Sequence, residues 1–179
     1  DIDLYFSSMV KSLGSLGGFI FGPKAVIKYL RYNTRSQIFA KSMPLMVVEG
    51  MLKRMDMIKT MPELREKLWY NVNKLQTGLK ERGFDIGGTN SPVTPIFMKG
   101  DVPEATQMVM DLRENYHIFC SIVVYPVIPK GDIIYRLIPT AAHSDADIDE
   151  TLQAFEETKK KLDAGAYKAV DIPDMAEAN

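Results

Sequence analysis

From Thr60 onward, stretches with helical spacing of apolar residues alternate with short extended apolar runs. The resulting order of helices and strands constrains the fold more than any other feature of the sequence. Helical spacing over Thr60 to Gly83 gives way to an extended apolar run over Val93 to Met98. The sequence then predicts a helix, two strands and a last helix: Pro103 to Asn115, Ile118 to Val124, Ile133 to Ile138 and a helix capped by Ser144. Such an order is typical of a small α+β layer, with helices on one face of a mainly antiparallel sheet.

The first part of the chain does not belong to that layer. Leu4 to Val10 predicts a short strand, Phe19 to Phe21 predicts a buried one, and Pro23 suits the first turn of a following helix. The chain opens on a strand already under way, so we expect it to be part of a longer polypeptide. We predict residues 1–43 as the end of a larger domain, 44–59 as a connecting helix, 60–165 as the small domain and 166–179 as a tail.

Composition excludes several classes of function. The 179 residues are 46% hydrophobic with a formal net charge of −1, which is typical of a soluble globular protein and gives no charge signature for nucleic acid. No apolar run is long enough to span a membrane, which leaves only peripheral membrane contact open. The single cysteine, Cys120, rules out an intramolecular disulfide and fits a cytoplasmic location. No residue cluster has the spacing of a metal site, so we expect no metal.

Lys11 is the strongest candidate for chemistry. It follows an apolar strand and stands among small hydroxyl residues and the glycines at positions 14, 17 and 18, which let a ligand approach the backbone. A lysine amine in such a place can attack a carbonyl to form a Schiff base. A solvated lysine at the end of a strand is the alternative, because short motifs have many false positives.

The stretch Asp3 to Phe19, DLYFSSMVKSLGSLGGF, resembles the cofactor-lysine segment of the α-oxoamine synthases. These are fold type I enzymes that use pyridoxal 5'-phosphate (PLP) to join an amino acid to an acyl-CoA with loss of CO2. The resemblance implies a fold type I PLP-transferase of the α/β class, here the end of its large domain and its small α+β domain. It also implies that Lys11 binds PLP covalently and that Ser8 hydrogen-bonds the cofactor phosphate.

A second likeness lies far away in the sequence. Pro126 to Gly131, then Arg136, then Thr140 to His143 are similar to the C-terminal signature of the same family, in which the arginine binds the substrate carboxylate. A planar guanidinium suits that role because it can grip a carboxylate with two hydrogen bonds. The residues alone also allow an edge-strand arginine that faces solvent.

Within the family, the segments YNTRSQIFAKSMP, TMPELREKLW and SIVVYPVIPKG resemble the bacterial soluble serine palmitoyltransferases. This likeness implies condensation of L-serine with palmitoyl-CoA to 3-ketosphinganine, the first step of sphingolipid synthesis, by a longer homodimeric enzyme. The chain departs from the family at Ala40, where a Ser or Thr usually reaches the partner's PLP phosphate. Ser42 is the candidate substitute.

Two alternatives remain open. A sibling activity, such as glycine C-acetyltransferase or 8-amino-7-oxononanoate synthase, would share Lys11 and Arg136 but use another acyl-CoA. A non-catalytic folding or dimerisation module is the alternative of another class, since the family's PLP-stacking histidine and its aspartate partner of the pyridine nitrogen cannot be located here. We therefore predict that the isolated chain is inactive and binds PLP poorly.

For the remaining polar residues and the cysteine we predict structural roles and no part in chemistry. We expect His143 to order the junction before the last helix, His117 to be exposed, and Cys120 to be a small core residue. Lys159 to Lys161 are expected to form the solvated face of that helix. Thr60, with Pro62 and Glu63, predicts a capping box at the start of the long central helix.

Overall fold

The computed structural model describes residues 2–98 and 100–168, and the chain divides into two compact units, Asp1–Pro62 and Glu63–Asn179. Each unit is described by itself. Because the contacts separate two units only, the predicted finer division at residues 43, 59 and 165 stays a prediction. No helix in the described part of the chain combines the length and apolarity needed to cross a membrane.

The first unit consists of an antiparallel hairpin and three helices. Strand β1 (Tyr5–Ser8) pairs with β2 (Gly18–Phe21), so that Ser8 lies opposite Gly18. Helices α1 (Lys24–Asn33), α2 (Arg35–Ile38) and α3 (Leu45–Thr60) follow.

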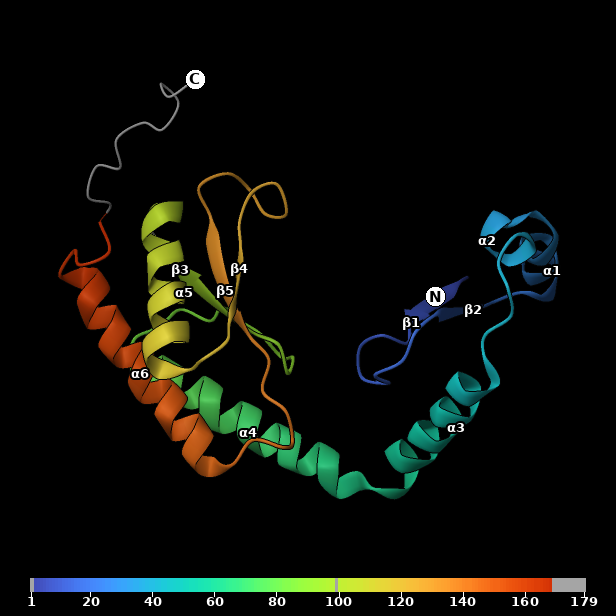
Figure 1. Ribbon diagram of the computed structural model, residues 1–179, viewed down its shortest axis with the longest axis horizontal. Coiled ribbons are helices and arrows are strands. Elements are labelled where there is room, and N and C mark those ends of the chain that lie inside the picture. Colours follow the sequence, from blue (N-terminus) through green and yellow to red (C-terminus); the bar gives the residue numbers. More distant parts are fainter. Residues whose placement is uncertain (1, 99, 169–179) are drawn as a thin grey trace. The chain divides into compact units, whose positions relative to one another are not determined.

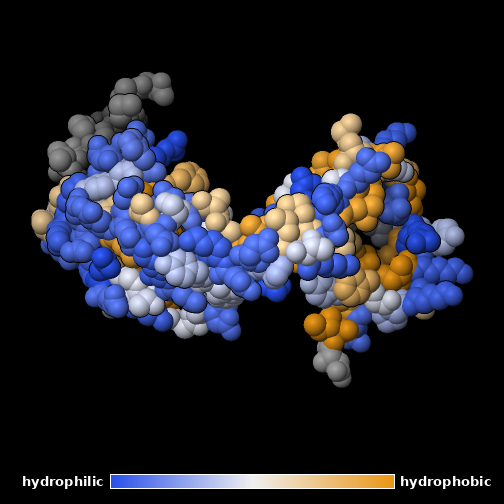
Figure 2. All heavy atoms as spheres, turned by 90° about the horizontal axis from the view of Figure 1, so that it is seen from below, coloured by the Kyte–Doolittle hydropathy of each residue, from blue (hydrophilic) through white to orange (hydrophobic). Residues whose placement is uncertain are grey.

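The prediction of a buried second strand was wrong for the described chain. All four residues of β2 are exposed, and Phe21 keeps 56% of its surface accessible. Its ring stacks on Tyr5 across the hairpin, with centroids 4.7 Å apart. Figure 2 shows hydrophobic residues gathered on the surface of this unit.

The predicted capping box at Thr60 was also wrong. Thr60 is the last residue of α3, and its Oγ1 donates to Asp56 O at 2.9 Å. Met61 interrupts the helical backbone, and α4 (Pro62–Glu81) starts at the proline. Proline suits a first helical position because its missing N–H would have no partner there. The hydroxyl that could have capped α4 thus bonds backward into α3.

The second unit contains the predicted α+β layer (Figure 1). After α4 come β3 (Thr94–Met98), α5 (Val102–Tyr116), β4 (Ser121–Val123), β5 (Ile133–Leu137) and α6 (Asp145–Asp163). The strands form one sheet in the order β3-β5-β4, and both pairings are antiparallel. The predicted element order and antiparallel sheet are therefore confirmed.

The core of this unit lies between the sheet and its three helices. Alternate residues of β5 point into it, and Tyr135 at the centre is fully buried with its hydroxyl donating to Ala105 O of α5 at 2.9 Å. Helices α4, α5 and α6 contribute side chains to the same apolar cluster, so they cover one face of the sheet (Figure 1). Members from the helices include Leu75, Leu79, Met108, Leu112, Ile148, Leu152 and Phe155.

The start of α6 is as predicted, but its lysines are not all solvated. Ser144 and Asp147 form a reciprocal capping box. Lys159, however, donates to Arg82 O at 3.2 Å and Gly83 O at 3.0 Å, which satisfies carbonyls at the end of α4. Lys161 pairs with Asp111 of α5 at 2.8 Å. Two of the three lysines thus join α6 to neighbouring elements.

Gly78 allows α4 and α6 to approach closely. A Cβ at this position would lie 2.8 Å from Leu152 Cδ2 and closer still to Cδ1. We predict that Gly78→Ala lowers the free energy of unfolding by about 1–2 kcal/mol, because overpacking outweighs the gain in helix propensity. Urea unfolding followed by circular dichroism measures the change.

Two controls test the cause. Gly88→Ala, where the new Cβ meets nothing within 4 Å, should change the free energy of unfolding by less than about 0.5 kcal/mol. In a Leu152→Ala background the cost of Gly78→Ala should disappear, since the clashing atoms are gone. An unchanged cost there would show that the close approach is not its cause.

Candidate active-site residues and family

Lys11 lies in the loop that closes the hairpin of β1 and β2. Met9 N donates to Gly17 O and Ser15 N donates to Met9 O, each at 3.0 Å, and these bonds hold the two ends of the loop together. Gly14 N donates to Lys11 O at 2.9 Å and makes a tight turn at the lysine itself. The Lys11 side chain is exposed. A hydrogen-bonded backbone therefore presents an amine that a ligand can reach.

Ser8 ends β1, three residues before the lysine. Its side chain is half-buried, and its Oγ accepts a long hydrogen bond of 3.4 Å from Val10 N. Accepting this bond leaves the hydroxyl proton available for donation to an anion. Gly18, directly opposite, has no side chain to cover it.

The segment before α3 lies against the lysine loop within the same chain. Gly17 has φ +92°, and a Cβ there would come within 2.9 Å of Met43 Cε. Met43 is preceded by Ser42, whose side chain is exposed. The predicted contact of Ser42 with a cofactor phosphate stays a prediction.

Arg136 stands on the central strand of the three-stranded sheet, so the alternative of an edge strand was wrong, although the side chain is exposed to solvent as that alternative also expected. Its neighbours are Ser121 of β4 and Pro95 of β3, directly opposite on either side. The side chain is exposed on the face of the sheet away from the core. Its Nε donates to Ser121 Oγ at 3.1 Å.

Beyond Ser121, the nearest side chains around Arg136 on its face of the sheet are apolar and uncharged. The next register row on the same face consists of Val123, Ile134 and Phe97, the last 42% exposed. No ion pair of Arg136 with an acidic residue is found in the described ranges 2–98 and 100–168. A guanidinium without a protein counter-ion beside apolar side chains is suited to bind a carboxylate from a ligand.

The connection that follows β5 is held by polar side chains. Asn71 of α4 is fully buried, and its Nδ2 donates to Thr140 O and His143 O, each at 2.9 Å. The imidazole Nδ1 of His143 in turn accepts from Thr140 N at 2.9 Å. His143 therefore orders the junction before α6, as predicted.

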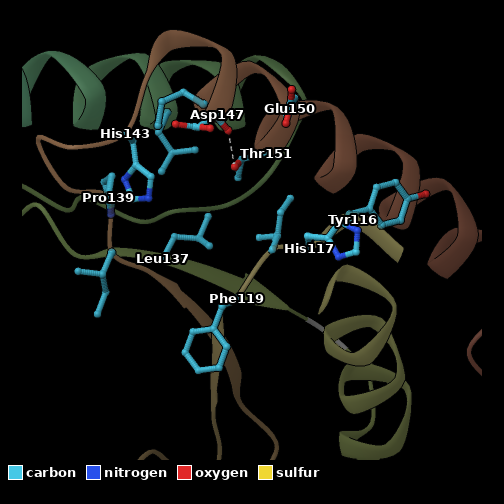
Figure 3. A pocket seen from close by; sticks show the side chains of 13 residues that line it. Tyr116, His117, Phe119, Leu137, Pro139, His143, Asp147, Glu150 and Thr151 are labelled. Atoms are coloured by element: carbon cyan, nitrogen blue, oxygen red, sulfur yellow. Dashed lines mark hydrogen bonds between the residues drawn. The ribbon is translucent and has the colours of Figure 1, made fainter. Parts of the chain in front are cut away.

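A surface hollow of about 480 Å³ adjoins this junction (Figure 3). His143, Asp147 and Thr151 lie on one side of it, with His117 and Phe119 on others. The Ser144 N–H and hydroxyl hold the pKa of Asp147 below its ordinary value, because both donate to its carboxylate. These polar groups serve the helix start, and neither Lys11 nor Arg136 lines the hollow.

Comparisons with known proteins place the chain in a family. Residues 1–155 match the family described as Aminotransferase class I and II. The chain belongs to this family. It is 59% identical over 171 residues to cysteate-C-fatty acyltransferase of Capnocytophaga ochracea, covering 96% of this chain and 41% of that protein. It is 38% identical over 152 residues to serine palmitoyltransferase of Sphingobacterium spiritivorum, covering 85% of this chain and 38% of that protein.

Solved structures agree with the sequence relatives. The structure of serine palmitoyltransferase from S. paucimobilis with a bound PLP–myriocin aldimine superposes with a TM-score of 0.82 at 27% identity, covering 91% of this chain and 41% of that chain. The predicted relation to the α-oxoamine synthases and the fold type I PLP-transferase fold are thus confirmed. The chain spans about two fifths of the length of the curated relatives it matches.

The family and the solved serine palmitoyltransferase structures, which contain PLP, indicate PLP as the cofactor, and the residues of the lysine loop are compatible with it. The exposed amine of Lys11 can form a Schiff base with an aldehyde, the Ser8 hydroxyl can donate to a phosphate, and Gly18 opposite it leaves room for a ligand. These features fit PLP, and the roles of Lys11 and Ser8 in holding it stay a prediction.

Sequence reasoning missed two neighbours of the candidate residues. Ser121 touches Arg136 across the register of β4 and β5, and Met43 touches the lysine loop from a segment about thirty residues away. Alternation along β5 pointed to the face that Arg136 occupies, but nothing in the sequence sets which residue of β4 lies opposite it.

Cys120 is buried in the core, as predicted. Burial raises the pKa of its thiol to about 11, so the protonated form dominates at pH 8. We predict that folded chain reacts with a thiol reagent at pH 8 many-fold more slowly than chain unfolded in urea. The rate is measured with an aromatic disulfide reagent that releases a coloured thiol when it reacts with cysteine. Equal rates in the folded and unfolded states would contradict the buried position of Cys120.

Proposed function

We propose that this chain is part of a PLP-dependent α-oxoamine synthase that transfers a fatty acyl group from a thioester to an amino acid with loss of CO2. Arg136 is the observation that carries the proposal: a guanidinium without an acidic partner in the described residues, on the central strand of a rigid sheet. The accessible amine of Lys11 on its hydrogen-bonded hairpin supports the same chemistry.

We propose cysteate as the preferred amino acid and L-serine as the second candidate. The cysteate-C-fatty acyltransferase relative shares 59% identity over 96% of this chain, against 38% over 85% for the serine palmitoyltransferase. This ranking differs from the sequence-based expectation, which placed L-serine and palmitoyl-CoA first. Both amino acids carry the α-amino and α-carboxylate groups that Lys11 and Arg136 are suited to handle, and they differ only in a sulfonate or a hydroxyl.

The residues of this chain would divide the work as follows. Arg136 binds the α-carboxylate and orients the amino acid. Lys11 holds the cofactor through Nζ and, once released from it, takes up the α-proton as a general base. PLP supplies an electron sink for the charge left at the α-carbon. Ser8 donates its hydroxyl proton toward the phosphate.

Other features of the whole enzyme also belong to the proposal. We expect a homodimer located in the cytoplasm, with Ser42 near a cofactor phosphate and the remaining pocket groups supplied by a longer polypeptide. The 179-residue chain alone is accordingly expected to be inactive. The sibling activity, 8-amino-7-oxononanoate synthesis, ranks lower because the relatives of that name are 31–35% identical to this chain.

Replacement of Lys11 tests the cofactor role. In the full-length enzyme, Lys11→Ala should abolish the visible absorption band of covalently held PLP and lower turnover by at least about a thousandfold, since both the anchor and the base are lost. Lys24→Ala, which removes another exposed lysine of the same unit, serves as the matched control. A normal band and normal turnover in the Lys11 variant would remove the central claim.

Competition between amino acids tests the substrate assignment. With palmitoyl-CoA and equal concentrations of cysteate and L-serine, the full-length enzyme should release mainly the product that retains the sulfonate, as identified by mass spectrometry. A dominant serine product would reverse the ranking of the two substrates. Faster turnover of glycine with acetyl-CoA, or of alanine with pimeloyl-CoA, would instead support a sibling activity.

A further inference from the structure

The guanidinium of Arg136 is only partly free, because one of its donors is used inside the sheet. Nε donates to Ser121 Oγ at 3.1 Å. Arginine has five N–H donors, so four remain, all on the two terminal nitrogens. A carboxylate can meet a guanidinium along the edge formed by Nε and one terminal nitrogen or at the end formed by both terminal nitrogens. The bond to Ser121 occupies the first edge.

The strand register fixes this arrangement. Ser121 lies directly across from Arg136 in the β4–β5 pair, where side chains on the same face are nearest neighbours. Pro95, on the opposite side, offers no polar side chain that could compete for the guanidinium. The hydroxyl therefore holds the arginine through Nε from the β4 side, and no hydrogen bond of the two terminal nitrogens is found among the described residues.

The nearby apolar side chains increase the importance of this single bond. Val123, Ile134 and Phe97 occupy the next row of the same face and supply no hydrogen-bond acceptor from their side chains. In such surroundings an arginine side chain is held in one rotamer mainly by the groups that it hydrogen-bonds. Without the Ser121 hydroxyl, the guanidinium would have to be ordered by the substrate itself, at an entropic cost.

We propose that Ser121 is a positioning residue that orients Arg136, so that the amino-acid carboxylate is bound end-on by the two terminal nitrogens. This inference rests on the proposed function of Arg136 as the carboxylate-binding residue. It assigns to β4 an indirect part in substrate affinity, through a residue that does not itself touch the substrate.

Kinetics of the full-length enzyme test the proposal. Ser121→Ala should raise KM for the amino acid about 3- to 10-fold, the range expected for one lost hydrogen bond, with kcat changed less than about twofold. Ser121→Thr keeps the hydroxyl and should return KM to within about twofold of the original. Thr106→Ala, which also loses one hydroxyl hydrogen bond but lies on α5, is the matched control and should leave KM unchanged.

A measurement that does not depend on activity completes the test. In cofactor-free enzyme labelled with 15N-arginine, the Nε–H proton of Arg136 should exchange slowly with water, and Ser121→Ala should accelerate this exchange about tenfold or more. Ser121→Thr should preserve the slow exchange.

The outcomes separate the inference from the proposed function. If Arg136→Ala raises KM about tenfold or more while Ser121→Ala leaves KM and exchange unchanged, the positioning role is overturned and the proposed function stands. If Arg136→Ala itself leaves KM unchanged, the proposed function fails. If Ser121→Ala lowers Tm and kcat without raising KM, or if threonine gives no rescue, the serine is merely structural and the inference is overturned.

Discussion

Pairing on both edges of β5 is the constraint on which the second unit depends. A strand bonded to β3 on one side and β4 on the other cannot slip by one residue without exposing its entire apolar set. Tyr135 is therefore held in the core, where its hydroxyl bonds to α5, and Arg136 is held on the opposite face. Alternate side chains of β5 thus pack against the three helices, while Arg136, the candidate substrate-binding residue, lies on the other face.

Much of this fold could be predicted because it follows from local periodicity. Alternating residues at 133–137 and the helical spacing after Thr60 are properties of the sequence itself, and the capping box at Ser144 needs only two residues three apart. The failures concern choices between partners. The Thr60 hydroxyl could either cap the start of α4 or donate to a carbonyl of α3, and it donates to Asp56 O of α3. Lys159 was expected in solvent, but it donates to carbonyls at the end of α4. No local pattern decides such competition.

The residues of the candidate site also differ in whether a local pattern in the sequence could predict them. Lys11 and Ser8 could be found because a contiguous motif places them on one hairpin, and the hydrogen bonds within its loop join residues fewer than ten positions apart. Arg136 could be identified only through its likeness to a family signature, since spacing alone equally allowed a solvated arginine. Ser121 escaped notice because its contact depends on the register between strands separated by the loop from Tyr125 to Gly131.

The two faces of β5 have different surroundings: one is packed under helices and the other is open. Substitutions at positions 133, 135 and 137 disturb packed helices, whereas those around Arg136 alter only the exposed face of the sheet. A substitution on the open face can therefore alter the surroundings of Arg136 with little effect on the free energy of unfolding of the unit. Relatives named for different substrates share this fold at 31–59% sequence identity. The packed core and the proposed binding residue thus lie on opposite faces of one strand.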